Sequence, residues 1–199
     1  MTTGLRPATF TNLQLNAGVF LKNFDYSSAT DKASLEALVL EALENETGLL
    51  GATRGGGTFQ CTPSIRTIEA DGMRYPVKGS TVNDMWTIKL TATLLEITPE
   101  NFADALMCCD AVTEGSKTTL SVRTDIKDDD YIPHLTWVGD TSKGLVLIDL
   151  HEALNLAGAN FTFTDKGEGT LPVEFQAHQA SVKDMATAPV TIIFFDEAN

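Results

Sequence analysis

The chain has 199 residues, of which 27 are acidic and 14 are basic, and its formal net charge is -13. This length favours a single domain over residues 1–199 with a substantial core. The acidic balance, without any cluster of Lys or Arg, excludes a protein that grips nucleic acid or an anionic membrane through its phosphates. No apolar run approaches the ~18 residues that cross a bilayer, so we expect no membrane partner.

The first 58 residues are expected to form an N-terminal arm and a helix. Weak alternation of apolar residues over residues 12–20 predicts a strand. Apolar residues at helical spacing predict an amphipathic helix over residues 31–45, with Asp31 as its cap. The glycine-rich residues 51–57 lack the Lys of a phosphate-binding loop and precede a strand, so we interpret them as a flexible linker or a close contact between subunits.

Residues 59–97 carry the clearest pattern, with apolar residues at every second position. This period predicts three antiparallel strands, each with one buried face, joined first by a tight turn at Asp71-Gly72. Trp86 is expected on the buried face of the third strand. Thr98 and Pro99 then predict the start of a short helix over residues 99–107.

The second half of the chain alternates between short apolar segments and turns. We expect strands at residues 119–126, 131–138, 145–148, 160–164, 171–178 and 189–195, and a short helix at residues 149–157. About ten strands and two or three short helices predict a mainly β domain, either a β-sandwich or an open barrel.

No local motif for catalysis, metal binding or cofactor binding stands out. The three histidines have no neighbour at a ligand spacing and are interpreted as structural: His134, His151 and His178. The three cysteines do not form a disulfide framework and are interpreted as buried or half-buried small apolar residues: Cys61, Cys108 and Cys109. We therefore expect no catalytic, cofactor or metal site and no enzyme activity.

An acidic cluster lies at Asp125 and residues 128–130. Its spacing is similar to that of a calcium loop, but the glycine at the sixth position and the closing glutamate are missing. We interpret the cluster as a solvated hairpin tip, with adventitious cation binding as the alternative.

Six segments in order carry a family resemblance. They read LQLNAGVFLKNF at 13–24, LGATRGGGTF at 50–59, YPVKG at 75–79, WTIKLTATLLEITPE at 86–100, DLHEALNLAG at 149–158 and GEGTLPVEFQAH at 167–178. Together they resemble the major tail tube proteins of long-tailed bacteriophages and prophages. Residues 110–145 match least and are expected to form a variable loop region.

The resemblance implies a β-sandwich subunit with a flanking helix that assembles into hexameric rings. The rings would stack into a tube in the virion tail, after synthesis and assembly in the bacterial host cytoplasm, and DNA would pass through the lumen without specific binding. Its partners would be further copies of itself and tail tip, terminator and chaperone proteins, with no cofactor. Gly55, Gly56 and Gly57 are then the expected assembly contact, because backbones without side chains approach closely. An acidic lumen would repel the DNA phosphates.

Two other functions stay open. A soluble β-sandwich binding module for a carbohydrate or protein ligand should expose a flat row of aromatic side chains, and Trp137 is the loose candidate here. An enzyme with dispersed carboxylates would need a cleft. Self-assembly would separate the tube subunit from both.

Overall fold

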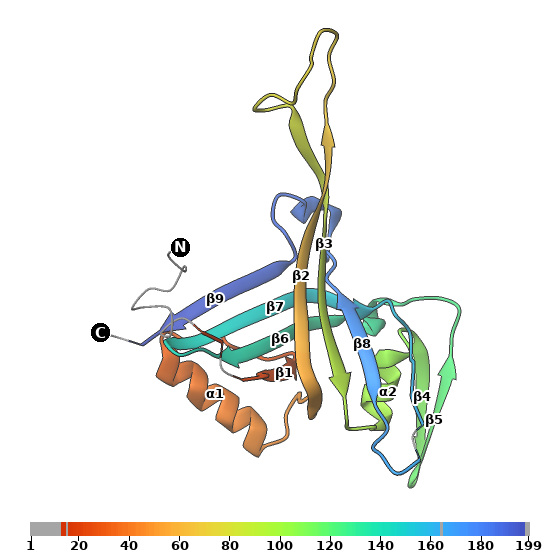
Figure 1. Cartoon of the computed structure of the whole chain (residues 1–199). Helices are drawn as coiled ribbons and strands as arrows, with labels where there is room; N and C mark the ends of the chain where they lie inside the picture. The colour runs from red at the N-terminus through yellow and green to blue at the C-terminus, as the bar shows by residue number, and fades with distance from the viewer. Residues whose placement is uncertain (1–12, 15, 164, 198–199) are drawn as a thin grey trace.

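A computed structural model describes residues 13, 14, 16–163 and 165–197. The prediction of a mainly β fold is confirmed, with nine strands and two α-helices in these residues (Figure 1). The strands are β1 (Val19–Lys22), β2 (Thr53–Thr67), β3 (Thr81–Leu94), β4 (Cys109–Glu114), β5 (Lys117–Val122), β6 (Ile132–Asp140), β7 (Gly144–Asn155), β8 (Leu171–Gln176) and β9 (Val190–Asp196). The helices are α1 (Lys32–Glu44) and α2 (Pro99–Ala105), and two short 3-10 turns lie at Asp128–Asp130 and Val182–Asp184.

Seven strands form one antiparallel sheet in the order β1-β6-β7-β8-β3-β2, and β9 lies off this path and pairs with the first part of β7, from Gly144 to Leu150. The long strand β7 pairs with β6 and β9 over most of its length but with β8 only at Leu154 and Asn155. Glu152 lies between these two parts of the strand and has a positive φ of 45°. The sheet therefore divides into a first half-sheet (β1, β6, β7 and β9) and a second half-sheet (β2, β3 and β8), which cross in Figure 1.

The main core lies between the two half-sheets. It takes buried apolar side chains from both of them, among them Phe20, Leu135, Leu150, Leu90, Leu94 and Phe175. The alternation predicted over residues 171–178 is confirmed, since Leu171, Val173, Phe175 and Ala177 are all buried. Burying one such aliphatic or aromatic side chain contributes about 1.5 to 3 kcal/mol, so this layer accounts for most of the stability of the body.

Both expected helix starts are confirmed by their caps. Oδ1 of Asp31 accepts a hydrogen bond from the backbone N–H of Ser34 at 2.8 Å, and Oγ1 of Thr98 accepts one from Asn101 at 3.1 Å. Helix α1 packs on the outer face of the first half-sheet, where Leu35 joins Val138 in a second apolar cluster.

The short helix expected at residues 149–157 is wrong, because β7 continues through Asn155. Its apolar residues Leu150, Ala153 and Leu154 are spaced as on a helix face, but pairing with β6, β8 and β9 decides the conformation. The middle strand expected within residues 59–97 is also wrong, since residues 68–80 form the loop that joins β2 to β3.

Other boundaries differ as well. β2 begins at Thr53, so the glycine-rich residues 51–57 run into a strand and the linker interpretation is wrong. β1 begins only at Val19, and β4 was not expected. The strand expected at residues 160–164 is reduced to a single bridge between Thr162 and Thr170. Most of the N-terminal arm, residues 1–12, and residue 164 lie outside the described residues.

Candidate assembly surface

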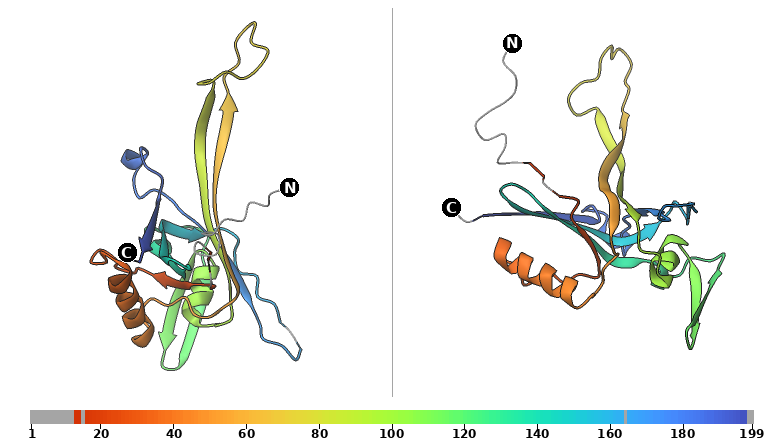
Figure 2. Two further views of the ribbon diagram at one scale, coloured as in Figure 1. Left: turned by 60° about the vertical axis from the view of Figure 1, so that its left-hand side comes forward. Right: turned by 60° about the horizontal axis from the view of Figure 1, so that its bottom comes forward.

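The β2–β3 hairpin extends far beyond the body of the molecule (Figure 2). At its base, β3 pairs with β2 on one side and with β8 on the other, from Lys89 to Leu94. Beyond Lys89, β2 and β3 pair only with each other within the described residues, as far as Thr67 and Thr81. We call residues 62–87, with their tip loop 68–80, the distal hairpin.

Burial of the apolar face changes abruptly along this hairpin. Ile88, Leu90 and Leu94 are buried, whereas Trp86 is 47% exposed and Ile65 is 64% exposed. The predicted burial of Trp86 is therefore wrong, and so is that of Cys61, which is exposed. Apolar side chains do alternate along the distal hairpin, but the first half-sheet does not extend far enough to cover them.

A second exposed apolar surface lies on β9. Ile192 is 46% exposed and Phe194 is 71% exposed. Both alternate with Ile193 and Phe195, which pack against the α1 side of the sheet, so Ile192 and Phe194 point to the opposite face. Within the described residues β9 pairs with β7 alone, which leaves its outer edge without a strand.

Gly55, Gly56 and Gly57 lie in a bulge near the start of β2. The register changes from Thr53 opposite Leu94 to Gly57 opposite Ala92, so β2 carries extra residues here. Gly55 and Gly56 have positive φ values of 76° and 73°, which glycine adopts without steric cost.

The packing around these glycines is unequal. A Cβ on Gly57 would lie 2.3 Å from the carbonyl oxygen of Thr91 and 2.7 Å from Cζ of Phe20, so contacts within this chain already require a glycine there. A Cβ on Gly55 would meet nothing within 4 Å. Of the three expected assembly contacts, Gly55 is therefore the one with open space beside it.

Two cavities lie beside these surfaces. One, of about 620 Å³, is lined by all three glycines and by Ala17, Phe20 and Trp137. The indole N–H of Trp137 donates to the carbonyl oxygen of Ala17 at 2.9 Å. Trp137, the candidate for an exposed ligand-binding aromatic residue, is therefore partly buried and hydrogen-bonded.

The other cavity, of about 980 Å³, lies at the base of the hairpin. Its lining includes Met85, Trp86, Tyr131, His178 and Met185. The exposed indole of Trp86 therefore borders a cavity of the size that ligand-binding sites commonly have.

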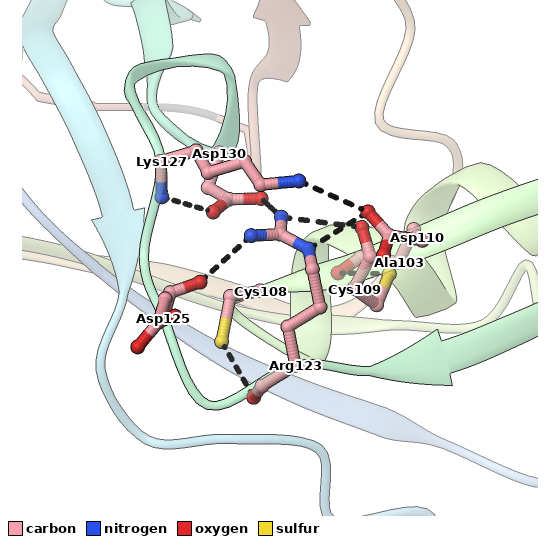
Figure 3. A network of polar contacts seen from close by, with 8 residues as sticks. All are labelled: Ala103, Cys108, Cys109, Asp110, Arg123, Asp125, Lys127 and Asp130. Carbon is pink, nitrogen blue, oxygen red and sulfur yellow. Dashed lines mark hydrogen bonds and ion pairs between the residues drawn. The ribbon is translucent and has the colours of Figure 1, made fainter.

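The acidic cluster is only partly a solvated tip (Figure 3). Asp125, Asp128 and Asp129 are exposed as expected, but the side chain of Asp130 is only 8% exposed. Asp130 pairs with the guanidinium of Arg123 and accepts the backbone N–H of Lys127 at 2.7 Å. Nε of Arg123 also lies 2.9 Å from Oδ1 of Asp110. These contacts join the β4–β5 hairpin to the loop before β6, which gives Asp130 a structural role.

The two adjacent cysteines belong to the same region. Cys108 is buried, with its Sγ 3.4 Å from the carbonyl oxygen of Arg123, and Cys109 is half-buried. Burial, and then the negative charge of Asp130, raises the pKa of the Cys109 thiol. Both observations agree with the interpretation of this pair as small apolar residues rather than nucleophiles.

The three histidines have different surroundings. His178 packs its ring edge-to-face against Tyr131, with ring centroids 5.3 Å apart, in agreement with a structural role. His134 and His151 lie opposite each other on β6 and β7 and converge with Asp149. Ligand spacing along a single segment does not reveal this cluster, because His134 lies on β6 whereas Asp149 and His151 lie on β7. The sequence does carry one sign of the cluster. Asp149 and His151 are two residues apart in an otherwise apolar strand, so their side chains lie on the same face.

Within the described residues, neither helix has the length and apolar character needed to span a bilayer. No protein-family model matches the sequence, and no curated protein matches it.

Proposed function

We propose that this chain is the repeating subunit of a phage tail tube, whose copies form hexameric rings that stack around a DNA-conducting lumen. The observation that carries the proposal is the exposed apolar face of the distal hairpin. Ile65 and Trp86 continue the line of side chains that is buried in the body, but no layer of this chain covers them. An isolated two-stranded hairpin is marginally stable in water, so a second surface is needed to cover this face.

The same chain offers a matching surface. Ile192 and Phe194 form an exposed apolar patch on β9, an edge strand whose outer side is unpaired among the described residues. The patch and the distal hairpin lie on different parts of the molecule, so the hairpin of one copy would cover β9 of the next. A contact between two different surfaces propagates from copy to copy and closes into a ring when the rotation allows. Pairing also removes the open strand edges, which otherwise favour aggregation.

The outer face of the second half-sheet is our candidate for the lumen wall. It carries Thr87, Lys89 and Thr91 on β3 and Glu174 and Gln176 on β8. Nζ of Lys89 lies 2.6 Å from Oε1 of Glu174, so these two opposite charges neutralise each other. A polar face with balanced charge would not retain DNA by counterion release. The lumen wall would then be neutral rather than acidic as expected from the net charge.

The first test is negative-stain electron microscopy of the purified protein at rising concentration, with mass photometry of the same samples. Hollow tubes or six-fold rings are expected. Particles that remain monomeric at every concentration, also in the presence of a crowding agent, would move the binding-module function to first place.

A pair of variants tests the proposed contact itself. Ile65→Asp removes the apolar donor surface and Phe194→Asp removes the acceptor, and each variant alone should stay monomeric. Mixed together, they should form dimers but no rings, because one intact contact remains between the two variants. Val112→Asp, an exposed apolar position on β4, is the matched control and should assemble like the wild type. Dimers or rings from either variant alone would contradict the contact.

The binding module remains the second candidate, for a carbohydrate or protein ligand. It is favoured by Trp86, which is exposed at the wall of the 980 Å³ cavity rather than buried as expected. An indole face of this kind stacks on sugar rings or on peptide side chains. A glycan array probed with monomeric wild type and with Trp86→Ser tests this function, which requires binding that the variant loses.

A further inference from the structure

A buried carboxylate lies on the outer face of the first half-sheet, on the opposite side of the sheet from Ile192 and Phe194. Strand β9 borders this cluster through Thr191, whose Oγ1 lies 3.1 Å from Nε2 of His151. Asp149 on β7 is fully buried. Its Oδ2 accepts a hydrogen bond from the phenol of Tyr26 at 3.0 Å and lies 2.8 Å from Nδ1 of His134. Its Oδ1 accepts a hydrogen bond from the hydroxyl of Thr136 at 2.9 Å. Nε2 of His151 lies 3.5 Å from the same Oδ2.

The strand register assembles this cluster. His134 lies opposite His151 and Thr136 lies opposite Asp149 in the β6–β7 pair. Residues two apart on a strand share a face, so all four side chains point to the same side of the sheet. One ring nitrogen of His134, one of His151 and a carboxylate oxygen of Asp149 lie within 4.8 Å of one another.

We propose that His134, Asp149 and His151 form a binding site for a divalent transition metal ion, with Zn²⁺ as the ion that the site fits. Zinc is held by imidazole nitrogens and carboxylate oxygens at about 2.0 to 2.2 Å, so its ligand atoms lie about 3.3 Å apart in a tetrahedral site. The distance of 3.5 Å from His151 to Asp149 meets this spacing, and the 2.8 Å from His134 would widen by a few tenths of an ångström. The metal would take the place of the proton that His134 and Asp149 share.

The surroundings supply what such a site needs beyond its ligands. Thr136 and Tyr26 hold the carboxylate from the protein side, which fixes its direction. The phenol of Tyr26 donates its hydrogen bond to Oδ2, and the hydroxyl of Thr136 donates to Oδ1. The side chains of His134 and His151 are 50% and 36% exposed, which leaves a way in for the ion and room for a water as fourth ligand.

The ligand set also selects among ions. Two imidazoles with one carboxylate suit zinc and its neighbours in the first transition row, whereas calcium and magnesium prefer sites made of oxygens alone. Bound zinc would link β6 to β7, because the ligands come from both strands. This inference goes beyond the proposed tube function, since the site would bind metal in a monomer or an assembly alike.

The test is calorimetric titration of the untagged full chain with ZnCl₂, beside the absorption spectrum of the Co²⁺ complex. We expect one zinc per chain and a cobalt spectrum typical of nitrogen and oxygen ligands. His134→Gln and His151→Gln should each weaken zinc binding roughly 100-fold. His178→Gln is the matched control, since this histidine lies outside the cluster, and it should bind zinc as the wild type does.

Three results would overturn the site. The first is a wild-type chain that takes up no zinc, and the second is equal affinity in His134→Gln and His178→Gln. The third is a thiolate band in the cobalt spectrum that disappears in Cys61→Ser, which would assign the metal to an exposed cysteine. Circular dichroism of His134→Gln checks that this variant is folded. His134 is chosen because its ring is half-exposed, whereas Asp149→Asn would turn a buried acceptor of two hydroxyl groups into an amide that can accept from only one of them.

Discussion

The two ends of strand β3 share one sequence pattern and have opposite surroundings. From Ile88 to Leu94, every second side chain lies in the core between the half-sheets. From Thr81 to Trp86, the strand belongs to the distal hairpin, where Met85 and Trp86 are exposed and Val82 is half-buried. Alternation along a strand therefore indicates that one face becomes buried. It does not indicate whether the layer that buries this face belongs to the same chain or to another one.

The contacts within each part follow this difference. The body combines the apolar core with hydrogen bonds on both sides of β3, whereas the distal hairpin has one ladder and an exposed ion pair between Arg66 and Asp84 at 2.8 Å. Exposed ion pairs contribute about 0 to 1 kcal/mol. The monomer thus has little to hold the distal hairpin in place, and its order would come from a partner.

The largest effect is expected from truncating one apolar side chain in each part. Phe175→Ala removes a buried ring and should lower the free energy of unfolding by about 3 to 5 kcal/mol. Ile65→Ala should change it by about 0.5 kcal/mol or less, because the side chain is 64% exposed. Urea denaturation of the monomer measures both. Similar losses in the two variants would show that the side chain of Ile65 is packed within the monomer, against the difference between the two parts.

A smaller effect is expected from adding one methyl group at either end of the glycine bulge. Gly57→Ala should destabilise the monomer by about 1 to 3 kcal/mol, because the new Cβ meets a backbone oxygen at 2.3 Å. Gly55→Ala should cost about 1 kcal/mol, which is the strain of its positive φ without any clash. Urea denaturation measures the stability of both variants, and electron microscopy then shows whether each variant forms rings. A stable Gly55→Ala protein that fails to form rings would place this residue in an interface, and a larger loss for Gly55→Ala than for Gly57→Ala would contradict the order.

The smallest effect concerns alkaline pH. Burial raises the pKa of Tyr26 to about 12 from the ordinary value of 10.0, so the folded chain keeps a proton that the unfolded chain releases. This contribution to stability is fully present below pH 10 and is lost as the pH rises towards 12. Tyr26→Phe should therefore show a shallower fall of Tm between pH 10 and 12 than the wild type. Tyr75→Phe, at the exposed hairpin tip, is the control and should follow the wild type; identical slopes in all three proteins would refute the assignment.

Local signals in the sequence were sufficient for part of this structure. The caps Asp31 and Thr98 located both helices, and the alternation ending at Phe175 and Ala177 located a strand and its buried face. Each of these depends on neighbours within a few residues. The failures depend on distant ones. Residues 149–157 looked helical because their apolar spacing suits both structures, and pairing with three other strands decides between them.

The two candidate sites were predictable to different degrees. The glycine-rich segment is visible in the composition. The need for a glycine at position 57 is not, because it arises from Phe20 and Thr91, which approach Gly57 only in the folded sheet. The exposure of Trp86 depends on where the opposite half-sheet ends. The histidine pair depends on the register between β6 and β7, and a shift by one residue would place His134 on the other face.

The order of the strands has a consequence for the growing chain. β2 and β3 are neighbours in sequence and can pair as soon as residue 94 is made, whereas β1 waits for β6 and β3 waits for β8, near residue 176. Contacts between nearby residues form faster than those that close long loops. During synthesis β2 and β3 can therefore begin to pair, with their apolar side chains exposed, before the first half-sheet that covers their base has been made. The exposed apolar side chains of neighbouring nascent copies would then meet on one polysome before any body has folded.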